Sequence, residues 1–171
     1  MGFAEAVRSG LRNYVTFSGR ARRSEYWWFA LFVFLGVLVF SLLDAMIFGV
    51  DPVTDEAPVI LSALFQLATL LPFLAVGWRR MHDAGYPGWY LLLPMALSLL
   101  SVFLILTGVF TVAMFEGTVE DPGALTGPAA SLGQVWMLVI SVLQIVLFFL
   151  IIWWLTRPSE PGPNAYGPPV Q

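Results

Sequence analysis

The chain has 171 residues, of which 58% are hydrophobic and 11% are charged, and its formal net charge is -3. Soluble domains average about 25% charged residues, so these values and a mean hydropathy of +0.81 exclude an ordinary soluble domain. Cysteine is absent, which excludes disulfides, thiolate metal sites and thiol nucleophiles.

Residues 1–18 are predicted to form a short amphipathic helix at the membrane surface. Apolar residues recur there at helical spacing, whereas Arg8 and Arg12 lie off that stripe. Ser18 and Gly19 end the pattern. The apolar stripe consists of Phe3, Val7, Leu11, Tyr14 and Val15.

Four long apolar stretches follow, and each exceeds the ~20 residues that a helix needs to cross a ~30 Å hydrocarbon core. Continuous apolarity without alternation favours helices over a barrel. The fold class is therefore all-α: a polytopic membrane protein with a four-transmembrane-helix bundle, forming a single membrane domain over 1–171. Pro72 and Pro94 predict kinks in the second and third spans. The predicted spans are 26–49, 57–78, 89–115 and 132–156.

The remaining segments are predicted to be irregular. Residues 79–88 form a loop rich in turn residues, and residues 116–131 form a long acidic loop with several glycines and prolines. Residues 157–171 contain too many prolines and glycines for a helix or a sheet, so we expect an irregular cytoplasmic tail.

The arginines set the expected orientation. All eight cationic side chains are arginines, and all fall before the first span, between the second and third, or after the fourth. The two opposite connections carry only acidic charges. By the positive-inside rule the arginine side is cytoplasmic, so we expect a multi-pass protein of the bacterial inner membrane with both termini inside.

This topology brings three polar segments, which are distant in the sequence, to one membrane face. Together they are expected to form a polar cap in which carboxylates hold arginines and tryptophans set the depth. The simplest explanation is that topology-determining arginines, their counter-ions and interfacial aromatics fill any such face. The cap consists of Arg20, Arg23, Glu25, Trp27, Arg79, Arg80, His82, Asp83, Trp89, Asn164 and Tyr166.

His82 is the only histidine, and catalysis by it would need an orienting partner and a nucleophile or metal. Too few carboxylates accompany it for a metal site. We therefore expect no catalytic residue, no metal and no cofactor, and a structural role for the imidazole, with a membrane enzyme as the less favoured alternative.

Asp44 is the only charged residue inside the four spans. An intramembrane acid suggests a proton or cation pathway, and a small transporter or channel subunit is the second functional alternative. A hydrogen bond between helices, or a position near the interface, explains the residue without transport.

Three motifs resemble one family, called domain of unknown function 805, whose members are small bacterial inner-membrane proteins. They lie at residues 14–27, 79–89 and 161–167, and the similarity extends over about Leu11 to Pro168. The resemblance implies a four-helix membrane protein and no particular activity.

The expected function is that of a non-enzymatic inner-membrane protein whose polar cap binds anionic lipid headgroups or a partner protein. Arginines near an anionic surface each contribute ~1 kcal/mol. The lipid bilayer is the expected partner, and a homo-oligomer is left open. Nucleic acid is not expected, because membrane topology already explains the arginines.

Overall fold

The computed structural model describes the backbone of residues 1–50, 57–115 and 122–169, with side chains except at 109–134. Over these residues every regular element is helical, and four helices are long and apolar enough to cross a membrane. This confirms the predicted all-α class. The elements are α1 (Phe3–Arg12), α2 (Arg23–Phe48), α3 (Ile60–Asp83), the 3-10 helix η1 (Gly88–Leu92), α4 (Leu93–Phe115) and α5 (Pro122–Thr156).

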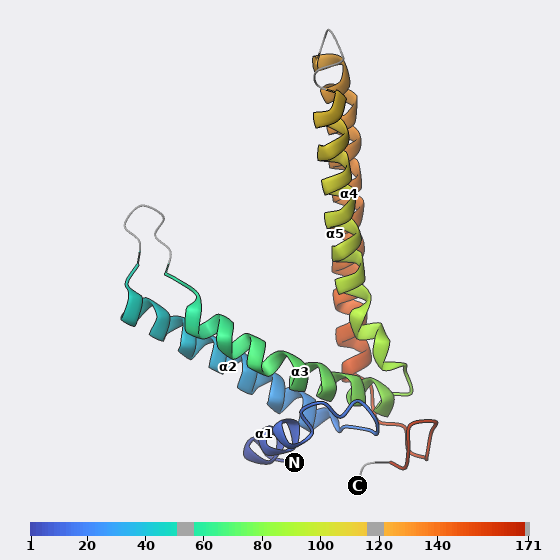
Figure 1. Ribbon diagram of the computed structural model, residues 1–171. Helices are drawn as coiled ribbons and strands as arrows, with labels where there is room; N and C mark the ends of the chain where they lie inside the picture. Colours follow the sequence, from blue (N-terminus) through green and yellow to red (C-terminus); the bar gives the residue numbers. More distant parts are fainter. Residues whose placement is uncertain (51–56, 116–121, 170–171) are drawn as a thin grey trace. The chain divides into compact units, whose positions relative to one another are not determined.

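The chain divides into two compact units, Met1–Gly88 with Trp154–Gln171, and Trp89–Trp153. Each is described by itself. In the first unit α2 and α3 form an antiparallel pair, and α1 packs against one end of it (Figure 1). The single domain expected from the sequence stays a prediction.

α1 docks on α2 through small residues. Ala6 and Gly10 are buried, and a Cβ added at Gly10 would lie 2.4 Å from the ring of Phe29. Glycine therefore permits the close approach. Phe3 adds an edge-to-face contact with Trp28, with ring centroids 6.0 Å apart.

α2 and α3 pack through aromatic rings and a second close approach. A Cβ at Gly36 would lie 2.2 Å from Phe65, and Phe65 stacks on Phe40 with centroids 4.9 Å apart. Near the other end of the pair, Tyr26 contacts Phe73 at 5.8 Å.

Pro72 lies inside α3 and removes the backbone N–H that would bond to the carbonyl of Ala68. The hydroxyl of Tyr14, from the segment after α1, donates a hydrogen bond to that carbonyl. The unit thereby satisfies a polar group that the bilayer could not.

Asp44 lies near the end of α2, and its carboxylate accepts hydrogen bonds from the start of α3. The Leu61 N–H donates to Oδ1 at 2.8 Å, and the Ser62 N–H donates to Oδ2 at 2.9 Å. The first amides of a helix have no intrahelical acceptor, so Asp44 caps α3 from the neighbouring helix.

Several predicted boundaries were wrong. α1 ends at Arg12 rather than at residue 18, and α3 continues through Asp83, so residues 79–83 are helical rather than loop. α5 begins at Pro122, which makes residues 122–131 helical; Pro is favoured in a first helical turn because its missing N–H needs no partner there. Residues 116–121 lie outside the described chain.

The second unit contains α4 and the part of α5 up to Trp153. The two helices run side by side (Figure 1). Gln144 on α5 donates a hydrogen bond of 2.8 Å to the hydroxyl of Ser98 on α4. Pro94 lies in the first turn of α4, directly after η1, where no intrahelical bond is lost. Pro94 therefore removes no hydrogen bond of α4, and the reason for predicting a kink at this residue does not apply.

Candidate functional site

The residues of interest meet at the end of α3, within the first unit. Asp83, the last residue of α3, is completely buried. Its Oδ1 accepts a bond of 2.9 Å from Arg20 Nε, and its Oδ2 accepts one of 2.7 Å from Arg80 Nη1. The Ser159 hydroxyl also donates to Oδ2. One buried carboxylate therefore joins two arginines to the C-terminal tail.

Arg80 is also completely buried, and its other donors reach the end of α5. Nε donates to the Leu155 carbonyl at 3.0 Å, and Nη2 donates to the Arg157 carbonyl. The last carbonyls of a helix lack intrahelical partners and carry partial negative charge. Arg80 thus caps α5 in the way that Asp44 caps α3.

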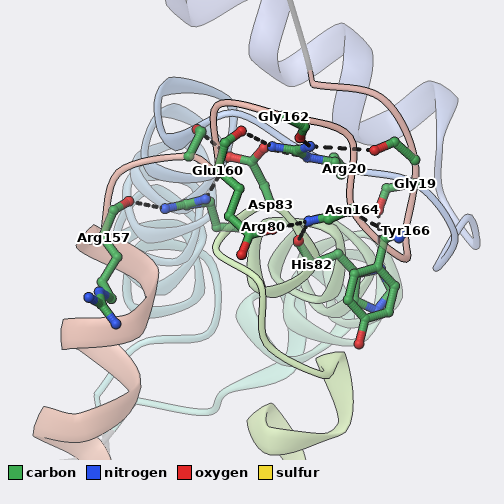
Figure 2. A network of polar contacts seen from close by, with 12 residues as sticks. Gly19, Arg20, Arg80, His82, Asp83, Arg157, Glu160, Gly162, Asn164 and Tyr166 are labelled. Atoms are coloured by element: carbon green, nitrogen blue, oxygen red, sulfur yellow. Dashed lines mark hydrogen bonds and ion pairs between the residues drawn. The ribbon is translucent and has the colours of Figure 1, made fainter.

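Arg20 holds the tail that follows α5 (Figure 2). Its Nη2 donates to the Glu160 carbonyl at 2.7 Å, and its Nη1 donates to the Gly162 carbonyl at 2.8 Å. Together with the bond to Asp83, these contacts use every nitrogen of the guanidinium. The irregular tail is consequently tied to the end of α3.

The tail closes with a tight turn in which Asn164 and Gly167 exchange two backbone hydrogen bonds of 3.1 Å. The Asn164 amide nitrogen donates to the carbonyl of His82 at 2.9 Å and to the side chain of Glu160 at 2.7 Å. The ring of Tyr166 then stacks on that of His82, with centroids 3.7 Å apart and planes 4° from parallel.

The imidazole of His82 is held on two sides. Its Nδ1 lies 3.1 Å from the Gly19 carbonyl, and the Tyr166 ring covers one face, as Figure 2 shows. Within the described ranges, no three His, Cys, Asp or Glu side chains gather closely enough to hold a metal ion. This geometry favours the structural role over chemistry at His82.

Gly85 ends α3 and sets the path toward the tail. Its φ is +82°, a left-handed conformation that glycine adopts readily. The Tyr86 N–H bonds back to the Met81 carbonyl at 2.9 Å, and the Gly85 N–H bonds to the His82 carbonyl at 3.1 Å. These two bonds form a Schellman motif. The turn residues after Asp83 suggested a loop from the sequence, and in the structure they end α3, which is longer than predicted.

Glu25 and Arg79 form a separate ion pair beside the network. Arg79 Nη1 lies 3.2 Å from Glu25 Oε1, and both side chains are buried. The Ser9 hydroxyl of α1 donates to the same oxygen at 2.9 Å. Glu25 at the edge of the apolar span thus has the arginine partner that its position required.

The remaining residues of the expected cap take no part in these contacts. Arg23 is exposed, and its Nη1 lies 3.5 Å from the Thr156 carbonyl oxygen, at the upper limit of a hydrogen bond. Trp27 is 42% exposed on α2, and Trp89 is 52% exposed in the second unit. The structure brings together Arg20, Arg80, His82, Asp83, Asn164 and Tyr166, and it pairs Glu25 with Arg79.

The sequence did not predict most of the groups that bind these arginines and carboxylates. Arg20 and Arg80 bind backbone carbonyls, which every residue possesses, so no residue type marks them. Ser9 and Ser159 are isolated serines without a distinguishing pattern. The one available signal was Glu160, the only carboxylate of the tail.

Comparison with known proteins gives relatives in the bacterial inner membrane. Inner membrane protein YhaH of Escherichia coli strain K12 is 42% identical over 83 residues, which cover 48% of this chain and 66% of that protein. Inner membrane protein YhaI of the same strain is 45% identical over 87 residues, covering 50% and 66%. The chain thus matches just under two thirds of the length of either relative. No solved structure matches it.

The family described as "Protein of unknown function (DUF805)" matches residues 14–122, a shorter range than Leu11 to Pro168. The match includes Arg20 and residues 79–83, but it stops before the tail that these residues hold. It covers more than half of the chain. This membrane protein therefore belongs to the DUF805 family.

Proposed function

We propose that the protein is a non-enzymatic inner-membrane protein whose arginine face binds anionic lipid headgroups. We define the arginine face as residues 1–23, 79–88 and 157–169, and we place it, with both termini, on the cytoplasmic side. The segregation of all eight arginines into or beside these segments supports that orientation.

The structure changes which arginines are available for this role. Arg20 and Arg80 are buried, and their donors are used by Asp83 and by tail carbonyls. They cannot supply charge to a ligand without releasing the tail. The charge comes instead from the exposed or half-buried arginines of this face, which are Arg8, Arg12, Arg22, Arg23 and Arg157. Arg79 is buried and paired with Glu25, but two of its donors have no partner.

The observation that carries the proposal is the geometry of α1. Its small residues are buried against α2, while Phe3 and Leu11 remain 40% and 44% exposed. Arg8 and Arg12 are exposed on another side of the helix. A helix with an apolar stripe and arginines on separate exposed faces suits the boundary between acyl chains and headgroups.

The test is headgroup selectivity in nanodiscs that contain equal amounts of phosphatidylglycerol and phosphatidylcholine. Native mass spectrometry of wild type should show enrichment of phosphatidylglycerol. The triple variant R8Q/R12Q/R23Q should lose most of it, because each cation contributes ~1 kcal/mol near an anionic surface. The matched control R8K/R12K/R23K keeps the charge and should retain the enrichment.

Two results would contradict the proposal. One is equal retention of both lipids by wild type. The other is a stoichiometric protein that co-purifies in place of lipid and is lost in the triple Gln variant, which would assign the arginine face to a protein partner.

A further inference from the structure

The ion pair between Arg79 and Glu25 leaves half of the guanidinium without an acceptor. Nη1 is the nitrogen that contacts Glu25. Among the residues that the structure describes, Nε and Nη2 of Arg79 are buried and have no hydrogen-bond partner. A buried donor without an acceptor costs about 1–3 kcal/mol, and more when the group is charged, so these two nitrogens are expected to meet an acceptor.

The two unpartnered nitrogens are neighbours on one edge of the guanidinium. Their N–H bonds point in parallel from that edge, which is the arrangement that binds two oxygens of one carboxylate or phosphate. A single oxyanion therefore satisfies both donors, whereas a side chain with one acceptor satisfies only one.

The surroundings favour a lipid phosphate as this oxyanion. The Ala21 N–H donates to the Arg79 carbonyl at 3.0 Å, so the basic segment 20–23 passes beside the pair. Trp27 and Trp28, close to Glu25 on α2, are 42% and 40% exposed, as expected for tryptophans at headgroup depth. Ser9 of α1 bonds to the same carboxylate and links the site to the helix that faces lipid.

We propose that Arg79 binds one phosphodiester group through Nε and Nη2, next to its ion pair with Glu25. This inference rests on the proposed function, since it names one specific headgroup site within the arginine face. Both nitrogens are covered by the protein in this structure, so neighbouring side chains must move aside for the phosphodiester to reach them.

The experiment compares wild type with R79K after delipidation, by native mass spectrometry of the full chain. Lysine can still pair with Glu25 but has no two-donor edge. Wild type should bind one phosphatidylglycerol, and R79K should bind it at least tenfold more weakly. Diacylglycerol with the same acyl chains should bind to neither protein, because it lacks the phosphodiester.

Inorganic phosphate distinguishes the two sources of the oxyanion. Competition by millimolar phosphate for the bound lipid supports a site for the phosphate group itself. Binding of inorganic phosphate to wild type with no binding of phosphatidylglycerol overturns the lipid assignment.

The variant E25Q separates ligand binding from the integrity of the ion pair. Glutamine keeps an acceptor for Nη1 but removes the competing charge, so E25Q should bind the lipid as tightly as wild type or more tightly. Loss of the lipid in E25Q to the same degree as in R79K overturns the inference.

The triple Gln variant retains Arg79 and should keep this one lipid while losing bulk enrichment. If R79K binds like wild type while the triple Gln variant still loses enrichment, the inference falls and the proposed function stands. If the triple variant keeps its enrichment, the proposed function falls on its own test.

Discussion

Asp44 accepts two hydrogen bonds from a single residue, Ser62, through one carboxylate oxygen. The Ser62 N–H lies 2.9 Å from Oδ2, and the Ser62 hydroxyl lies 2.8 Å from it. α3 has no capping side chain of its own at Val59, so the neighbouring helix supplies the acceptor. The carboxylate of Asp44 thus has a structural role, as the hydrogen-bond acceptor for the first residues of α3.

Replacing Asp44 should therefore reduce stability. Asp44→Ala leaves two amides and a hydroxyl of α3 without an acceptor, and we expect a loss of about 2 kcal/mol, seen as a lower Tm in detergent. Ser62→Ala removes only the hydroxyl bond and should cost about 0.5–1 kcal/mol. Equal effects of the two variants would contradict the capping role. A liposome flux abolished by Asp44→Asn but unaffected in Ser62→Ala would favour transport.

The contact between Tyr14 and the Ala68 carbonyl predicts a coupled pair of substitutions. Tyr14→Phe should cost about 1 kcal/mol, the net value of a typical hydrogen bond. Pro72→Ala restores the N–H that bonds to the same carbonyl. In a Pro72→Ala background Tyr14→Phe should therefore cost much less, and a double-mutant cycle measured by thermal unfolding checks this. Strictly additive effects would show that the two groups do not share the carbonyl.

Asp83→Asn should release the tail. The substitution keeps the shape of the side chain but leaves Arg20 and Arg80 buried without a counter-ion, which costs about 3–5 kcal/mol when one partner of a buried pair is removed. A nitroxide attached at Ala165→Cys should become more mobile by electron paramagnetic resonance. Glu5→Gln, a change of an exposed carboxylate on α1, is the matched control and should leave the spectrum unchanged. An immobile label in Asp83→Asn would show that the tail is held by other contacts.

Gly85→Ala tests the end of α3. Its φ of +82° is unfavourable for alanine by roughly 1–2 kcal/mol, and the added Cβ would lie 2.3 Å from the Glu160 carboxylate. Gly162→Ala is the control from the same network, since no atom lies within 4 Å of its added Cβ. The first variant should lower Tm measurably and the second should not. Similar Tm values would argue against a strained turn at Gly85.

The proposed orientation is testable because the natural chain has no cysteine. Thr54→Cys and Thr118→Cys, in connections outside the described residues, should react with an impermeant thiol reagent in intact spheroplasts. Ser18→Cys and Ala165→Cys should react only after permeabilisation, and the cysteine-free parent gives the background. Any other pattern refutes the orientation.

The four spans were predictable because a helix needs ~20 consecutive apolar residues to cross the hydrocarbon core of a bilayer. Such a stretch is easily recognised in a sequence, and α2 to α5 each contain one. Their polar ends were not predictable in the same way. α3 continues through Arg79–Asp83 because buried partners and the Gly85 stop motif support polar residues beyond the apolar stretch.

The clustering of the candidate residues followed from topology, whereas the identity of each pair did not. Arginines on one membrane face can pair with any nearby carboxylate, and only coordinates show that Asp83 takes Arg20 and Arg80 while Glu25 takes Arg79. For Asp44 the sequence suggested a hydrogen bond between helices but not its partners. These are two backbone amides and one hydroxyl of α3, and every residue has a backbone amide, so no residue type marks them.

The bond from Arg20 to the Glu160 carbonyl spans 140 positions of the chain, and this separation determines the order of assembly during synthesis. At ~20 residues per second, the upper end of the usual elongation range, the tail emerges about 7 s after Arg20. Until then Arg20, Arg80 and Asp83 lack their tail partners. The polar network can therefore close only after the tail has been made, and a chain that stops before Arg157 would leave these three buried charges without the carbonyl and hydroxyl groups that complete their hydrogen bonds.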